Sequence, residues 1–491
     1  MLSDTLLHQL QQSFALTPTD EQAEAFRTFA AFMLSREDRA AMILRGSAGT
    51  GKTSVAAAIV RTMDRLKQKT VLLAPTGRAA KVFSQKAGHP AFTIHRRIYR
   101  QKSIDGGFTL APNLASDTLY LVDEASMIAN YGAVSEGLFG TGRLLDDLVS
   151  FVYSGTRCRL MLIGDKAQLP PVGEDDSPAL SSEFMAGYAL DIHEADLNTV
   201  LRQSQQSGIL YNATVIRELI TRDEATQLPR IRFHGFADIV LLPGGELIDT
   251  LSASYSEVGV DETMVITRSN KRANIYNQGI RNTVLDLSDL LSSGDIIMIV
   301  KNNYYWMEQE FKAMAAELKT PNSPLPIPQM PSFLANGDRA IVRRVRHTRE
   351  LYGFTFADLL LQFPDYDDYE LTATVLTDSL TTEAPSLTQE QSNRLFNAVL
   401  EDYADERTKP ERMKRLKQDP YFNAIQIKYA YAVTCHKAQG GQWAHVYVDQ
   451  GYMTDDMLTP DYIHWLYTAF TRATERLYLV NWPANQTCSE D

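Results

Sequence analysis

The chain carries Gly46-Ser47-Ala48-Gly49-Thr50-Gly51-Lys52-Thr53 between an apolar run at 41–44 and a run of small and apolar residues at 54–60. The first run predicts a buried strand and the second predicts a helix. Glycines let the backbone curl until successive N–H groups face one centre, and a helix N-terminus adds positive potential there. A chance glycine turn is the alternative, but the flanking strand and helix favour a phosphate-binding loop. In such a loop Lys52 reaches the outer phosphates and the Thr53 hydroxyl holds Mg²⁺.

Length and composition indicate a multidomain globular protein. A chain of 491 residues is too long for one hydrophobic core, so about three domains are expected. No segment approaches the length of apolar sequence that crosses a membrane, and the first residues do not form a secretory signal. The cysteines, Cys158, Cys435 and Cys488, have neither metal-site nor disulfide spacing. We therefore expect a reduced, cytoplasmic protein that makes no contact with a membrane.

The net charge of −12 argues against a protein that coats nucleic acid through bulk electrostatics. Local basic clusters remain, and each is either a solvated surface or a contact to phosphate, which the sequence leaves open. The clusters are Arg96, Arg97, Arg100 and Lys102; Arg343, Arg344, Arg346 and Arg349; and Lys409, Arg412, Lys414, Arg415 and Lys417.

Polar residues follow a second apolar run, 70–74, which predicts another buried strand. Strand ends in an open α/β sheet face the ligand crevice, so Thr76, Arg78 and Lys81 are placed to meet a polyanion. Residues 93–97 have the same character. A short Gly-rich stretch between 100 and 118 has the turn chemistry of a hairpin.

Two further apolar runs, 119–122 and 160–163, also end in polar residues. The first delivers Asp123, suited to complete a Mg²⁺ shell, and Glu124, suited to polarise the water that attacks a γ-phosphate. The second leads to Gln168, whose amide is either a loop side chain or a contact to the γ-phosphate or the attacking water. Upstream, Thr17 and Pro18 predict a helix N-cap and first turn.

Nine sequence blocks occur in an order that resembles the superfamily 1 DNA helicases, specifically their RecD-like and Dda-like branch (superfamily 1B). The blocks are GSAGTGKT at 46, APTGRAAK at 74, TIHRRIY at 93, LVDEASM at 121, LIGDKAQLPPV at 162, TVLRQS at 199, VITRSNKRAN at 265, VTCHKAQGGQW at 433 and YTAFTRATERLYLV at 467.

The resemblance implies an α/β fold with two RecA-like domains, each a doubly wound parallel sheet. The first motor domain is expected at 1–193, with a hairpin insertion at about 96–118. The second is expected in two parts, 194–294 and 425–491. Between these parts, 295–424 is expected to hold an SH3-like β-barrel with a helical extension.

The resemblance also implies roles for individual residues. Catalytic roles fall to Lys52, Glu124, Gln168, Arg202 and Arg472, although Arg202 taken alone would more often be a surface ion pair. Gln22 is assigned to adenine, Thr53 and Asp123 to Mg²⁺, and residues 46–53 to the phosphates. Gln442, where family members often carry Glu, is assigned to the nucleotide. The expected DNA contacts are Thr76, Arg78, Lys81, Thr93, His95, Arg97, Phe108, Thr434, His436 and Lys437.

The expected function is an ATP-dependent and Mg²⁺-dependent DNA helicase, active as a monomer on single-stranded DNA and on junctions with duplex. The short insertion in the first domain and the barrel in the second resemble the branch that moves 5′ to 3′. One alternative is a translocase that displaces proteins or unwinds RNA or hybrids. A P-loop ATP switch or scaffold is another. A role in DNA replication, recombination or repair is expected, with no identifiable pathway or loading partner.

Overall fold

The computed structural model describes residues 2–101, 108–131, 140–200, 206–222, 228–317, 330–331, 333–454 and 457–488. The chain divides into two compact units. Unit one comprises Met1–Leu242, Ala438–Val448 and Tyr452–Asp491, and unit two comprises Pro243–Lys437 and Asp449–Gly451.

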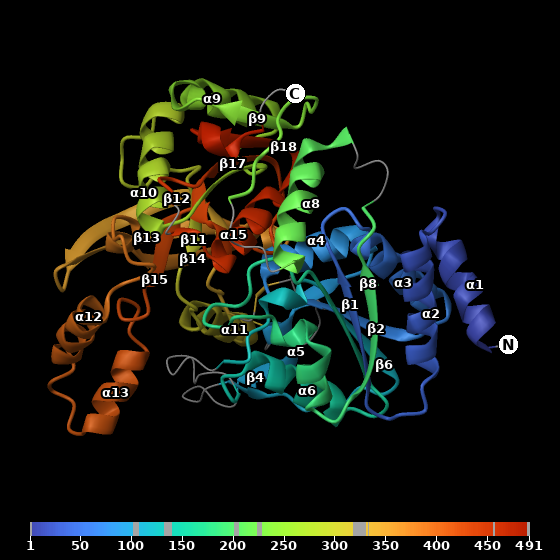
Figure 1. The fold of residues 1–491 in the computed structure, drawn as a ribbon. Coiled ribbons are helices and arrows are strands. Elements are labelled where there is room, and N and C mark those ends of the chain that lie inside the picture. The colour runs from blue at the N-terminus through green and yellow to red at the C-terminus, as the bar shows by residue number, and fades with distance from the viewer. Residues whose placement is uncertain are drawn as a thin grey trace. The chain divides into compact units, whose positions relative to one another are not determined.

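The large sheet of unit one has six strands in the order β3-β2-β6-β7-β1-β8, and every pair is parallel (Figure 1). The central strands β6 and β7 are almost entirely buried, which explains why they appear in the sequence as unbroken apolar runs. The strands are β1 (Ala40–Gly46), β2 (Lys69–Ala74), β3 (Ala91–Thr93), β6 (Thr118–Val122), β7 (Arg159–Gly164) and β8 (Asp191–Leu197).

Helices surround this sheet and bury their apolar sides against it. Side chains from α1, α2 and α3, such as Leu10, Phe29 and Val60, share one core with the β1 residue Met42. Because the strands are parallel, the connections cross back through helices that must shield both faces of the sheet. The helices are α1 (Leu2–Phe14), α2 (Asp20–Leu34), α3 (Lys52–Arg65), α4 (Gly77–Ala87), α5 (Ile94–Ile98), α6 (Leu144–Ser154) and α7 (Ser182–Ala186).

The start of α2 differs from the sequence-based expectation that Thr17 is the N-cap. Thr19 caps the helix instead: its hydroxyl accepts the Gln22 N–H, and Gln22 Oε1 accepts the Thr19 N–H. This reciprocal capping box satisfies two backbone donors at once, which a cap at Thr17 would leave open. Helix α1 was not expected from the sequence at all.

The expected hairpin is present as two short antiparallel strands, β4 (Tyr99–Gln101) and β5 (Phe108–Leu110), with Tyr99 opposite Leu110. The connecting residues 102–107, including Gly106, lie outside the described part of the chain.

The strands of the second predicted motor sheet fall in both units. In unit one, β18 (Ala473–Val480) pairs in parallel with β17 (Trp443–Asp449) and β9 (Ile239–Leu242). Helices α8 (Gly208–Thr221) and α15 (Pro460–Phe470) accompany them. In unit two, β10 (Thr263–Thr267) pairs in parallel with β16 (Ala432–Thr434). The prediction of an α/β fold with parallel sheets is confirmed.

Unit two contains the expected small barrel, closed in the order β11-β12-β13-β14-β15. Its strands are β11 (Ile296–Ile299), β12 (Arg339–Leu351), β13 (Phe354–Phe363), β14 (Tyr369–Leu376) and β15 (Ile425–Tyr429). Between β14 and β15, α12 (Gln389–Glu401) and α13 (Lys409–Lys417) pack on Phe354 and Phe356. The remaining α-helices of unit two are α9 (Leu247–Glu257), α10 (Asn270–Gly279), α11 (Tyr305–Glu317) and α14 (Cys435–Ala438).

Among the helices in the described ranges, none combines the length and the apolar content that crossing a bilayer requires.

Candidate nucleotide site

The glycine loop joins β1 to α3 through backbone conformations that favour glycine. Gly49 and Gly51 have φ values of +76° and +87°, in the left-handed region. A Cβ on Gly46 would lie 2.8 Å from Thr50 Oγ1 and 2.9 Å from Lys52 Cγ. The loop therefore needs glycine at these three positions to turn tightly into the N-terminus of α3.

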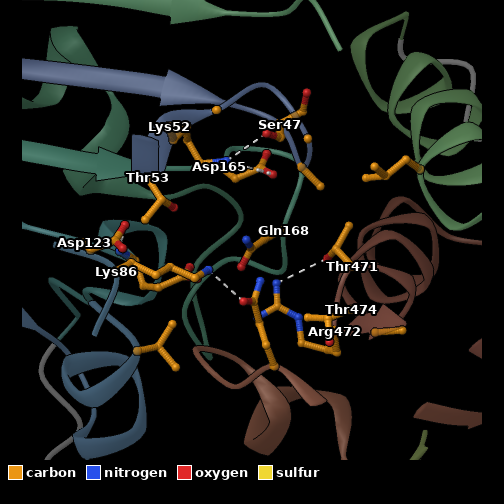
Figure 2. Close-up of a pocket in the computed structure, with 18 of the residues that line it drawn as sticks. Ser47, Lys52, Thr53, Lys86, Asp123, Asp165, Gln168, Thr471, Arg472 and Thr474 are labelled. Atoms are coloured by element: carbon orange, nitrogen blue, oxygen red, sulfur yellow. Dashed lines mark hydrogen bonds and ion pairs between the residues drawn. The ribbon is translucent and has the colours of Figure 1, made fainter. Parts of the chain in front are cut away.

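A cavity of about 430 Å³ opens beside this loop, entirely within unit one (Figure 2). Its walls come from segments that are far apart in the sequence: the loop and start of α3, helix α4, the ends of β6 and β7, the start of α8, and the segments around 440 and 472. The lining residues that the sequence had singled out are Ser47, Ala48, Gly49, Gly51, Lys52, Thr53, Asp123, Glu124, Gln168, Gln442 and Arg472.

Lys52 lies across the mouth of the loop. Its Nζ donates to the carbonyl oxygens of Gly46 and Ser47, at 2.5 and 2.9 Å, and lies 3.9 Å from Asp165 Oδ2. This places a positive charge beside the backbone turn, as a triphosphate site requires.

The two acids follow β6 directly. Asp123 Oδ1 accepts the N–H of Glu124 at 2.9 Å. Burial raises the pKa of Asp123 to about 6, and the neighbouring Glu124 carboxylate adds to the rise. Glu124 has φ of +52°, a left-handed conformation that is uncommon for a residue with a side chain. With Thr53 on the same cavity wall, Asp123 offers the oxygen donors that Mg²⁺ prefers.

Gln168 presents a buried polar atom to the cavity. Its side chain is only 6% exposed, and Oε1 has no hydrogen-bond partner among the described residues. Leaving such an acceptor unpaired costs roughly 1–3 kcal/mol. Because this oxygen accepts, it suits a donor such as a water molecule better than it suits a phosphate oxygen.

Arg472 is a buried cation at the opposite wall, 2% exposed. Its guanidinium donates to the carbonyl oxygens of Thr468 and Gly441, both at 3.1 Å, and to Thr471 Oγ1 at 3.2 Å. Within the part of the chain that the structure describes, all its partners are thus uncharged. A buried charge without a counter-ion is unfavourable, so the position suits an anionic ligand. Arg202, the other predicted arginine, lies outside the described residues.

Helix α15, which ends two residues before Arg472, is bonded to the loop that carries Gln168. Thr468 Oγ1 accepts the Leu169 N–H at 2.8 Å. The Tyr467 hydroxyl donates to Asp165 Oδ2 at 2.7 Å and accepts the N–H of Ala48, in the phosphate loop, at 2.9 Å. The sequence analysis did not single out Tyr467 or Asp165. Both residues could have been found from the sequence, since Tyr467 is the first residue of the last sequence block and Asp165 follows a buried strand as Asp123 does.

Gln22 and Gln442 occupy different surroundings. The Gln22 amide is engaged within the protein: Nε2 donates to the Thr50 carbonyl at 3.0 Å, and Oε1 accepts from Thr19. Gln22 is not among the residues that line the cavity, whereas Gln442 is. Gln442 is held by α4, because its carbonyl accepts from Arg78 at 3.0 Å and its Oε1 accepts from Lys86 at 2.9 Å.

Apart from Phe108, the expected DNA contacts of unit one lie along α4 and α5. The hydroxyls of Thr76 and Thr93 cap these helices. Lys81 is half-buried and Arg97 is exposed. Burial lowers the pKa of His95 to about 4, so this imidazole is neutral at pH 7 and supplies no charge to a phosphate.

The remaining expected DNA contacts are Phe108 on β5 and three residues of unit two. Thr434 ends β16, and His436 and Lys437 belong to α14. Burial lowers the pKa of Lys437 to about 8. Its ammonium is therefore still largely charged at pH 7.

Two protein-family models match the chain. An AAA domain matches residues 17–228, and a UvrD-like helicase C-terminal domain matches residues 429–480. A crystal structure of the Pif1 helicase from Bacteroides in complex with ADP-AlF3 and ssDNA aligns with 97% of this chain and 95% of its own, at 14% identity and a TM-score of 0.45.

Two curated relatives align over parts of the chain. The ATP-dependent RecD2 DNA helicase of Deinococcus radiodurans is 33% identical over 132 residues, which are 27% of this chain and 16% of that protein. The ATP-dependent DNA helicase dda of Enterobacteria phage T4 is 24% identical over 278 residues, 54% of this chain and 57% of that protein. The matched segments span less than two thirds of either relative's length. The two domain matches and these two relatives support the resemblance to the superfamily 1B helicases.

Proposed function

We propose that the protein hydrolyses ATP and uses the energy to move 5′ to 3′ along single-stranded DNA and unwind duplex DNA. The observation that carries the proposal is the composition of one cavity. The buried Arg472 guanidinium with only neutral partners, and the unpaired Gln168 oxygen, face the same space as Lys52 and the two acids. A buried cation with neutral partners and a buried acceptor without a protein donor suit the negative phosphates of a nucleoside triphosphate and the water that attacks it.

The residues divide the chemistry of phosphoryl transfer between them. Lys52 binds the outer phosphates, Glu124 polarises the attacking water, and the free oxygen of Gln168 accepts a hydrogen bond from that water. Arg472 stabilises the negative charge that spreads over the transferred phosphoryl oxygens. Mg²⁺ held by Thr53 and Asp123 would neutralise part of the phosphate charge.

Several assignments in this proposal depend on the family likeness. They comprise adenine recognition by Gln22, the nucleotide contact by Gln442 and the second arginine, Arg202. The domain boundaries and the DNA contacts also depend on the family likeness. The proposed DNA contacts are Thr76, Arg78, Lys81, Thr93, His95, Arg97, Phe108, Thr434, His436 and Lys437. We also propose that the protein acts as a monomer on single strands and on junctions with duplex.

The first test is ATP turnover of the purified protein with and without single-stranded DNA, in Mg²⁺. We expect turnover that DNA stimulates, and loss of turnover in Lys52→Ala, because the ammonium that binds the outer phosphates is gone. Lys69→Met, at the far end of β2, is the matched control and should keep the wild-type rate. Nucleotide binding without turnover, or turnover that DNA does not change, would favour a P-loop switch over a motor.

A further inference from the structure

Lys86 is a cation of the cavity that neither the sequence motifs nor the proposed chemistry uses. It lies in the last turn of α4 and lines the cavity, where its side chain extends toward Gln168 and Arg472 (Figure 2). Its Nζ donates to Gln442 Oε1 at 2.9 Å. The partner is therefore a neutral amide, which orients the ammonium and leaves its charge uncancelled.

The positive charge of Lys86 balances the charges of the residues that line the cavity. The charged lining residues in the described part of the chain are Lys52, Lys86 and Arg472 against Asp123, Glu124 and Asp165. Without Lys86 the carboxylates would outnumber the cations in a site that takes a polyanion. Lys86, although exposed to solvent, also lies within electrostatic range of Asp123 and Glu124: partial desolvation beside the protein lowers its pKa, and both carboxylates act to raise it.

Contacts on two sides fix the position of the Lys86–Gln442 pair. Arg78, on the same helix as Lys86, holds the Gln442 carbonyl at 3.0 Å. Gly440, with φ of +72°, approaches α4 so closely that a Cβ there would lie 3.1 Å from Ala79 Cβ. Helix α4 and residues 440–442 thus form one packed wall. A glutamate at 442 would keep that wall but pair with the Lys86 ammonium and cancel its charge.

We propose that Lys86 is a nucleotide-binding residue whose ammonium, oriented by the Gln442 amide, contacts the terminal phosphate of ATP. The terminal phosphate is the part of the ligand that fits best, because Lys86 faces the same region as Gln168 and Arg472. This inference rests on the proposed function, since it requires the cavity to bind ATP.

The test compares the affinity of two probes in Mg²⁺: ADP and the non-hydrolysable β,γ-imido analogue of ATP. Lys86→Met removes the charge and keeps most of the length of the side chain. Because one charge-assisted contact is lost, the affinity for the analogue should fall by about tenfold or more, and the affinity for ADP by less than about threefold. Lys86→Arg should keep most of the analogue affinity. Gln442→Glu should also lower the affinity for the analogue. Lys69→Met should bind both probes like the wild type.

The outcomes separate this inference from the proposal on which it rests. Analogue binding by Lys86→Met within about twofold of the wild type would overturn the assignment, and so would equal losses for ADP and the analogue. Failure of the wild-type protein to bind either probe would overturn the proposed function itself. A thermal melt of each variant shows whether a loss comes from unfolding, and a folded Lys86→Met that discriminates less between the probes supports the contact.

Discussion

Arg472 is a buried guanidinium with no carboxylate partner among the described residues, which suits the anionic ligand that we propose. Its three protein partners are two carbonyl oxygens and one hydroxyl. These hold the guanidinium in a fixed orientation without neutralising it. A charge prepared in this way is best used where negative charge grows during the reaction, because stabilisation that appears in the transition state raises the rate.

This placement predicts a separation of binding from turnover in Arg472→Ala. Turnover should fall by about three orders of magnitude, as loss of an arginine from a phosphoryl-transfer site does, while affinity for the ATP analogue falls much less. Steady-state turnover and equilibrium binding measure the two effects. Arg476→Ala removes an exposed arginine of β18, the strand that begins directly after Arg472, and is the control. Equal losses of turnover and affinity would indicate a structural role for Arg472.

Helix α15 and the 165–169 loop are joined by several hydrogen bonds, which are buried or partly buried. The Tyr467 hydroxyl donates to Asp165 and accepts from the Ala48 N–H, and the Thr468 hydroxyl accepts from the Leu169 N–H. His464 Nδ1 lies 2.9 Å from the Ala167 carbonyl, and Gln439 donates to the Leu169 carbonyl at 2.7 Å. The phosphate loop, the Gln168 loop and the helix before Arg472 are therefore connected by hydrogen bonds.

Tyr467→Phe tests this connection with little change in shape. Removal of the hydroxyl leaves an Asp165 oxygen and the Ala48 N–H without this partner, so the melting temperature should fall by roughly 2–6 °C. Tyr478→Phe is the control, because no hydrogen bond of its hydroxyl is found in the described residues and its ring stacks on Tyr447. A double-mutant cycle with Asp165→Asn should give a coupling of about 1 kcal/mol. Strict additivity would contradict a direct interaction.

For the whole molecule, the sequence predicted the elements better than the contacts between them. Apolar runs that are buried on both faces, such as β6 and β7, are visible as strands because of their composition. The capping box at Thr388 and Gln391 is equally local, since its partners are three residues apart. The Tyr467–Ala48 bond joins residues more than four hundred positions apart. Only tertiary packing decides such a contact. The hydrogen bond from the Gln22 amide to the Thr50 carbonyl was not predicted for the same reason.

The direction of movement is a property of the whole molecule, since the residues around the phosphates are shared by motors that run either way. The accessory elements bear on it. Among the described residues, unit one carries the short β4–β5 pair beside its large sheet, and unit two carries the barrel β11–β15. This combination resembles the branch that moves 5′ to 3′. A duplex with a 5′ single-stranded tail should therefore be unwound in ATP and Mg²⁺, and one with a 3′ tail should not.

Strand separation of fluorescently labelled substrates measures this preference directly. Lys52→Ala on both substrates controls for melting that does not depend on ATP, and a blunt duplex controls for entry without a tail. Matched RNA and hybrid duplexes show whether unwinding is selective for DNA. Preferential unwinding of the 3′-tailed duplex would refute the predicted direction and leave the ATPase assignment standing, because the roles proposed for the cavity residues do not depend on which way the strand passes.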